Sequence, residues 1–153
     1  MGCDIHMHME QKVDGEWREI HGEFSAVCAE DCPSVPFDWR TYAVFSFLNH
    51  EVRNYGGMPP VFGEEGRGVP DDSVFKAEWE DEYSRDYHSA SWLLVSELLA
   101  VDYDNIMTQY ANDPLPVSLR DTLHDFFFMD LKILKDMAGE YPENIRLVFW
   151  FDN

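Results

Sequence analysis

The stretch of sequence that decides the fold reads CDIHMHMEQKVDGEWREI at residues 3–20. Polar and apolar residues alternate along its first half, which is the pattern of a strand with one buried face. Asp14 and Gly15 then form a strong hairpin signal, because both central residues of such a turn need positive φ. The sequence therefore predicts two strands joined at this turn, at residues 3–13 and 16–21.

The register of this hairpin follows from its turn. If Val13 pairs with Glu16, then Met9 lies opposite Ile20, and the apolar side chains of the first strand share one face. The opposite face collects polar side chains, namely Asp4, His6, His8, Glu10 and His21. One face of the hairpin is thus predicted to join the core, and the other to carry imidazoles and carboxylates.

The rest of the chain predicts helices and one closing strand. Helical spacing of apolar residues indicates a short helix near 39–50 and a long one near 117–138. The intervening residues 56–70 hold five of the nine glycines and form an irregular loop. Aromatic and β-branched residues at 145–151 favour a final strand. This order predicts an α+β domain, in which an antiparallel sheet formed by the N-terminal hairpin and the C-terminal strand packs against helices.

The long helix has clear start and stop signals. Ser118 and Asp121 resemble a capping box at its beginning, and Gly139 is a good stop. Its predicted apolar face consists of Leu119, Leu123, Phe126, Phe127, Leu131, Leu134 and Met137.

Length and composition fit a single domain over residues 1–153. Apolar residues make up 45% of the chain and aromatic residues 15%, too much for a disordered chain. No apolar run reaches the roughly 18 residues of a membrane span, and the N-terminus lacks a signal-peptide pattern. Cys28 and Cys32 have no second cysteine pair to complete a zinc site. We therefore expect a soluble, intracellular protein that does not bind membranes.

The charge of the chain is strongly negative. Thirty Asp and Glu residues against eleven Lys and Arg give a formal net charge of −19. Such a field repels the nucleic-acid backbone and argues against direct nucleic-acid binding. It suits a protein that binds cations, engages a basic partner or imitates a polyanion, and it also serves simple solubility.

The polar face of the first strand holds the strongest candidate for chemistry. Asp4, His6 and His8 alternate, so their side chains point the same way at intervals of roughly 6.6–7 Å. Carboxylate and imidazole bind divalent metals well, and a bound metal delivers hydroxide near neutral pH. The pattern predicts a divalent metal ion, its identity left open, on these three residues. The alternative is a solvent-facing strand. If the last strand pairs beside the first, Asp152 lies near this hairpin.

Three further polar residues are candidates for catalysis. His88 stands in an unusually polar stretch before Trp92, and it suits a fourth ligand or a general acid. Arg53 and Asn54 follow the first predicted helix and precede the glycine-rich loop at 56–70. An arginine there can clamp phosphate or carboxylate, or it can cap helix carbonyls or pair with one of the many acids.

Five blocks of the sequence are distinctive. They are MGCDIH at 1–6, VRN at 52–54, GVPDD at 68–72, HSASWL at 88–93 and RLVFWFDN at 146–153. Together they resemble a family of small proteins encoded by tailed phages and prophages. The resemblance implies a phage accessory protein in the cytoplasm of the bacterial host, and it transfers no catalytic residues. By analogy, phage proteins of this size often counter host defence, by degrading or sequestering nucleotide signals or by blocking a nuclease.

These observations lead to one functional hypothesis and one alternative. The hypothesis is a metal-dependent hydrolase of a phosphate-containing small molecule, such as a nucleotide signal. The first strand holds the metal, His88 is ligand or acid, and Arg53 with Asn54 contacts the substrate under the 56–70 loop. The alternative is a non-catalytic acidic protein that sequesters a ligand, or that imitates nucleic acid and blocks a basic host protein. The sequence leaves the oligomeric state open.

Overall fold

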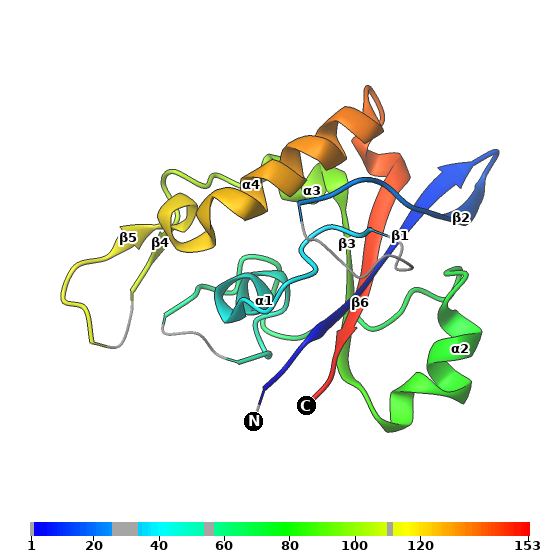
Figure 1. Cartoon of the computed structure of the whole chain (residues 1–153), viewed down its shortest axis with the longest axis horizontal. Coiled ribbons are helices and arrows are strands. Elements are labelled where there is room, and N and C mark those ends of the chain that lie inside the picture. The colour runs from blue at the N-terminus through cyan, green and yellow to red at the C-terminus, as the bar shows by residue number, and fades with distance from the viewer. Residues whose placement is uncertain (1, 26–33, 54–56, 110–111) are drawn as a thin grey trace.

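The centre of the fold is one four-stranded antiparallel sheet in the order β2-β1-β6-β3 (Figure 1). The strands are β1 (Ile5–Val13), β2 (Glu16–Ile20), β3 (His88–Leu94) and β6 (Ile145–Phe151). The first and last strands are thus neighbours, and both chain ends lie at one end of the sheet. The computed structural model describes residues 2–25, 34–53, 57–109 and 112–153.

Helices pack around this sheet, which confirms the predicted α+β class and the pairing of the N-terminal hairpin with the C-terminal strand. The helices are α1 (Tyr42–Leu48), α2 (Lys76–Asp81), α3 (Val95–Ala100) and α4 (Leu119–Ala138), with 3-10 turns η1 (Tyr83–Arg85) and η2 (Pro142–Asn144). A separate two-stranded sheet pairs β4 (Met107–Thr108) with β5 (Val117–Ser118). None of the helices in the described ranges is long and apolar enough to span a membrane.

The hairpin has the register predicted from its turn. Met9 pairs with Ile20. Asp14 and Gly15 have φ of 52° and 82°, the positive values that a tight turn between twisted strands requires. The closing strand, Ile145–Phe151, has the bounds expected from its aromatic and β-branched residues. The turn signal and the residue types of the closing strand therefore predicted the two central strands, β1 and β6, correctly.

Each face of the sheet packs against its own hydrophobic layer. On one face, alternate residues of β1 and β6 are buried with α1, α3 and α4 in the main core. The opposite face is covered by aromatic residues from α2 and from the segments beside it, and Figure 1 shows α2 across the sheet from α1 and α4. This aromatic layer consists of Val69, Phe75, Ala90, Val148 and Trp150, with Trp79, Tyr83, Tyr87 and Trp92 partly buried against it. The polar face predicted for β1 is thus mostly covered.

β3 is the strand of the main sheet that the sequence pattern does not indicate, and the short strands β4 and β5 were not predicted either. A bulge between His88 and Ser91 shifts the register against β6, and Ser89 there has a φ of 57°. An inserted residue breaks the period of two on which strand recognition depends. The outer edge of β3 is covered, because Gly68 N donates a hydrogen bond to Ala90 O at 2.9 Å.

α4 begins and ends as predicted but is interrupted inside. Ser118 Oγ accepts a hydrogen bond from Asp121 N at 3.2 Å, and Gly139 ends the helix with a φ of 58°. His124 has φ 64° and ψ 168°, which are not helical values. The interruption turns Phe126 outward, where it is 58% exposed. The prediction that Phe126 belongs to the apolar face was therefore wrong.

A buried ion pair joins the two central strands. Glu10 and Arg146 pair across the ladder of β1 and β6 and are 0% and 3% exposed. Arg146 Nε donates to Glu10 Oε2 at 2.6 Å, and its guanidinium lies 4.0 Å from the centre of the Trp17 ring. A second donor, Nη1, reaches Asp72 Oδ1 at 2.8 Å. The guanidinium is thus held from three sides.

The same ion pair fixes the segment that leads into α2. Glu10 Oε1 accepts hydrogen bonds from Ser73 Oγ at 2.9 Å and from Val74 N at 2.7 Å. Phe75 follows directly and enters the aromatic layer. The second face of the sheet is therefore covered by a segment that the buried carboxylate anchors.

Replacing Arg146 by methionine is expected to destabilise the protein by about 3–5 kcal/mol, because Glu10 is left charged, buried and unpaired. The double variant E10Q/R146M should recover part of this loss. The measurement is the free energy of unfolding in urea. Lys132→Met is the matched control, because Lys132 forms an exposed pair with Asp136 and its loss should cost less than about 1 kcal/mol. An R146M variant no weaker than K132M would contradict this account.

Replacing His124 by glycine is expected to stabilise the protein by about 1 kcal/mol. A residue with a Cβ at this φ and ψ pays on the order of 1–3 kcal/mol of strain, and the entropy cost of glycine offsets part of the gain. Asp125→Gly, one position further on in helical backbone, should instead cost about 1 kcal/mol. Urea titrations of the two variants should therefore move in opposite directions from the parent protein.

Candidate functional site

The polar residues gather where the two ends of the chain meet. Ile5 pairs with Phe151 at the end of the central ladder, and Asp152 N donates a hydrogen bond to Asp4 O at 3.1 Å beyond it. His6 pairs with Trp150, so it projects to the face that carries the aromatic layer. This end of the sheet therefore brings together side chains from residues near both termini.

His6 and Asp152 form the pair at the centre of this site. His6 Nε2 lies 2.7 Å from Asp152 Oδ2, and the two side chains are 35% and 34% exposed. Asp152 Oδ1 also accepts a hydrogen bond from Asp4 N at 3.1 Å, which fixes the carboxylate. The ring of Tyr87 packs on the imidazole at a centroid distance of 4.6 Å. A carboxylate that orients a solvent-accessible imidazole is the arrangement of a general base.

Asp4 is bound by an arginine. Arg40 Nε and Nη2 donate to the two carboxylate oxygens of Asp4 at 2.9 and 2.7 Å. These hydrogen bonds lower the pKa of Asp4. Asp38 lies near the same groups: burial raises its pKa, and the nearby His6 opposes that rise. Two further carboxylates thus border the His6 pair, one of them neutralised.

Arg53 reaches the same end of the sheet from the segment after α1. Burial raises the pKa of the Cys3 thiol, and a hydrogen bond with Arg53 opposes the rise. The Arg53 guanidinium also lies 5.2 Å from the centre of the Tyr42 ring. Tyr42 Oη in turn accepts a hydrogen bond from Cys3 N at 3.4 Å. Cys3 and Tyr42 belong to the main core, whereas His6 projects to the aromatic layer, so these contacts place Arg53 at this end of the sheet but on its main-core side.

His8 lies in the aromatic layer. Its ring centre is 4.4 Å from that of Phe75 and 4.5 Å from that of Trp150. Its Nε2 is buried and has no hydrogen-bond partner among the described residues. Burial lowers the pKa of His8 to about 4, so the imidazole is neutral at physiological pH. His8 is therefore a packing residue in this structure.

His88 comes to the same end of the sheet but to its other face. It pairs with Phe151, which belongs to the main core, whereas His6 pairs with Trp150 in the aromatic layer. Residues opposite each other in an antiparallel ladder project to the same face. His88 Nδ1 lies 2.8 Å from Ser89 Oγ, and its Nε2 is buried without a partner within the described ranges. The structure thus places His88 and His6 on opposite sides of the sheet.

Each of the three predicted metal ligands contacts a different kind of group. Asp4 is bound by an arginine, His6 by a carboxylate, and His8 by aromatic rings. In the part of the chain that the structure describes, no group of three or more His, Cys, Asp or Glu side chains is arranged to hold a metal. The divalent ion therefore stays a prediction from the sequence, and we derive no chemical step from it.

Several residues singled out from the sequence, namely Asn54, Cys28 and Cys32, lie outside the described residues. The end of the glycine-rich loop is fixed to the edge of the sheet, where Arg67 N donates to Ser91 Oγ at 3.0 Å. The closing of this loop over a substrate stays a prediction.

Sequence reasoning missed Arg40, Asp38 and Tyr87 as neighbours of His6. The first two precede α1 and the third precedes β3, so no spacing along the chain connects them with the first strand. The position of Asp152 was predictable, because pairing of the last strand with the first places this residue beside the hairpin. In the structure Asp152 contacts His6 and the backbone of Asp4.

Comparison of the chain with protein-family models, with curated proteins and with solved structures found no match. The resemblance to small proteins of tailed phages therefore stays an expectation from the sequence blocks. The functional argument depends on the geometry of the site.

The stability of the protein is expected to fall as the pH is lowered from about 6.5 toward 4. The folded state keeps His8 neutral down to a pKa of about 4, whereas the unfolded chain binds a proton near pH 6.5. The stabilisation is therefore complete above pH 6.5 and is lost on acidification, by about 3 kcal/mol at most.

His8→Phe should remove this part of the pH dependence, since it keeps an aromatic ring in the layer without a titrating group. The control is His21→Phe at a half-exposed position, which should change the pH dependence much less, because the charge of His21 has the smallest of the three effects on the pKa of His8. The measurement is urea unfolding at pH 7.0, 5.5 and 4.5. Equal pH dependence in the parent protein and H8F would show that His8 is not buried as a neutral group.

Proposed function

We propose that the protein is a hydrolase of a phosphate-containing small molecule, in which Asp152 and His6 act as an acid–base pair. The observation that supports this proposal is the 2.7 Å contact between His6 Nε2 and Asp152 Oδ2 in a site that is about one-third exposed. Asp152 is itself held by the backbone of Asp4, so the imidazole is supported by a fixed group.

The chemistry follows from the orientation of the imidazole. When the Nε2 proton is donated to Asp152, the lone pair of His6 is on Nδ1. Nδ1 then takes a proton from an attacking water, and Asp152 stabilises the imidazolium that forms. The protonated His6 subsequently gives its proton to the leaving oxygen. Tyr87 restricts the ring on one side, so the imidazole stays in place through both transfers.

An anionic substrate needs local positive charge in a chain with a net charge of −19. Arg53 is the predicted source of that charge, and it contacts Cys3 and Tyr42 on the main-core side of the same end of the sheet. Arg40 is half exposed and offers further N–H donors, although its charge is paired with that of Asp4. Guanidinium groups bind phosphate oxygens in a fixed, two-donor geometry.

His6→Gln and Asp152→Asn are each expected to lower kcat/KM by on the order of 10²–10⁴, because each removes one half of the acid–base pair. The assay is hydrolysis of a panel of phosphate esters that includes cyclic and linear nucleotides, with release of product followed by chromatography. His21→Gln is the control, since it removes an exposed imidazole elsewhere on the hairpin.

The same assay separates the competing hypotheses. Turnover that survives a chelator supports the acid–base pair, whereas turnover restored only by a divalent ion supports the metal predicted from the sequence. Hydrolysis by H6Q at the parent rate contradicts the proposed role of His6. Binding of a nucleotide without any turnover favours the alternative, an acidic protein that sequesters its ligand.

A further inference from the structure

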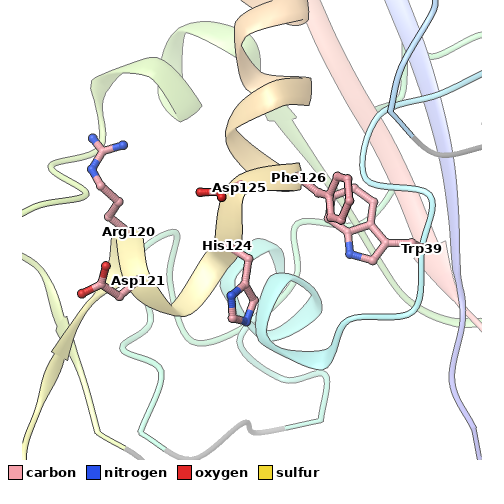
Figure 2. A pocket seen from close by; sticks show the side chains of 6 residues that line it. All are labelled: Trp39, Arg120, Asp121, His124, Asp125 and Phe126. Atoms are coloured by element: carbon pink, nitrogen blue, oxygen red, sulfur yellow. The ribbon is translucent and has the colours of Figure 1, made fainter.

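A second site lies beside the interruption of α4, and none of its lining residues belongs to the pair described above. It is a cavity of about 590 Å³. Figure 2 shows Trp39 and Phe126 together on one side, with Arg120 and Asp121 on the other and His124 between them. The cavity thus has an aromatic wall and a charged wall.

The aromatic wall exists because α4 is interrupted. The non-helical backbone of His124 leaves three consecutive side chains, at 124–126, exposed, whereas Phe127 next to them is buried. Phe126 therefore points outward and meets Trp39 edge to face, with ring centres 6.3 Å apart. Phe126 is exposed and Trp39 half-buried, and the accessible faces of such rings carry negative charge that attracts cations.

The charged wall is negative. Arg120 is neutralised within the protein, because its Nε lies 2.6 Å from Asp104 Oδ1 and its guanidinium stacks 4.6 Å from the centre of the Phe128 ring. Asp121 and Asp125 have no ion-pair partner among the described residues. The cavity therefore offers two carboxylates that form no ion pair within the described ranges, beside one arginine that is already paired with Asp104.

We propose that this cavity binds an arginine side chain of a basic protein partner. A guanidinium stacks flat on an aromatic face while its edge donates to carboxylates, and the cavity provides both groups. A phosphate or carboxylate ligand would meet two like charges instead. The net charge of −19 also steers basic proteins toward this surface. The proposal is independent of the hydrolase proposal, since the two sites share no residue.

The test is a titration of the ¹⁵N-labelled protein with the peptide acetyl-Gly-Arg-Gly-Arg-Gly-amide in 150 mM salt, followed by NMR. We expect shifts of the Trp39 indole N–H and of the amides at 124–126. The same peptide with lysine in place of arginine should bind about threefold more weakly, because an ammonium does not stack.

Two variants and two matched controls locate the binding. Phe126→Ala and Asp125→Asn should each weaken the arginine peptide by about threefold, as expected for loss of an exposed cation–π contact or ion pair. Asp136→Asn removes the same charge elsewhere on α4, and Leu115→Ala truncates another exposed apolar residue. Both controls should bind as the parent protein does. The spectra themselves report whether each variant is folded.

Three results would overturn the proposal. The first is the absence of shifts at Trp39 and 124–126. The second is equal weakening by D136N and D125N, which would mean that the peptide follows net charge alone. The third is binding of free arginine amide as tightly as the peptide, which would assign the cavity to a small organic cation rather than to a protein partner.

Discussion

The buried pairing of Glu10 with Arg146 sets the register of the two strands on which the fold is built. A charge without exposed surface is tolerated only opposite its partner, so a slip of β1 against β6 by one residue leaves both charges buried and unpaired. This constraint places His6 opposite Trp150, and so decides the face to which the candidate catalytic imidazole projects. The same carboxylate anchors the segment before Phe75 and thereby closes the aromatic layer over the second face.

The candidate site is a product of the two chain ends meeting in the middle of a sheet. In a protein with thirty acidic residues, one carboxylate at this end, that of Asp4, is paired with an arginine, Arg40. Beside the interruption of α4, Asp121 and Asp125 form no ion pair among the described residues, because Arg120 in the same cavity pairs with Asp104. The molecule thus presents two polar regions of different electrostatic character, which suit ligands of opposite sign.

The parts of the fold that follow from short-range rules were predictable. The turn at Asp14 and Gly15 determined the hairpin register, and the cap at Ser118 determined the start of α4. β3 was not predictable, because its bulge removes the period of two. The exposure of Phe126 was not predictable either, because an irregular residue inside a helix leaves no sequence signal. At the site, the alternation of polar and apolar residues along β1 correctly predicted a polar face, but it did not predict which groups these side chains contact. Whether an imidazole meets a carboxylate or an indole depends on residues that approach from distant segments.

The central position of the last strand has a consequence for biosynthesis. The residues that join β1 to β6 through the buried pair are 136 positions apart, so β1 has no inner neighbour until the ribosome has translated Ile145–Phe151. Until then the nascent hairpin exposes an open edge and an uncovered apolar face. Such an intermediate is a target for chaperones and a nucleus for aggregation when synthesis is fast.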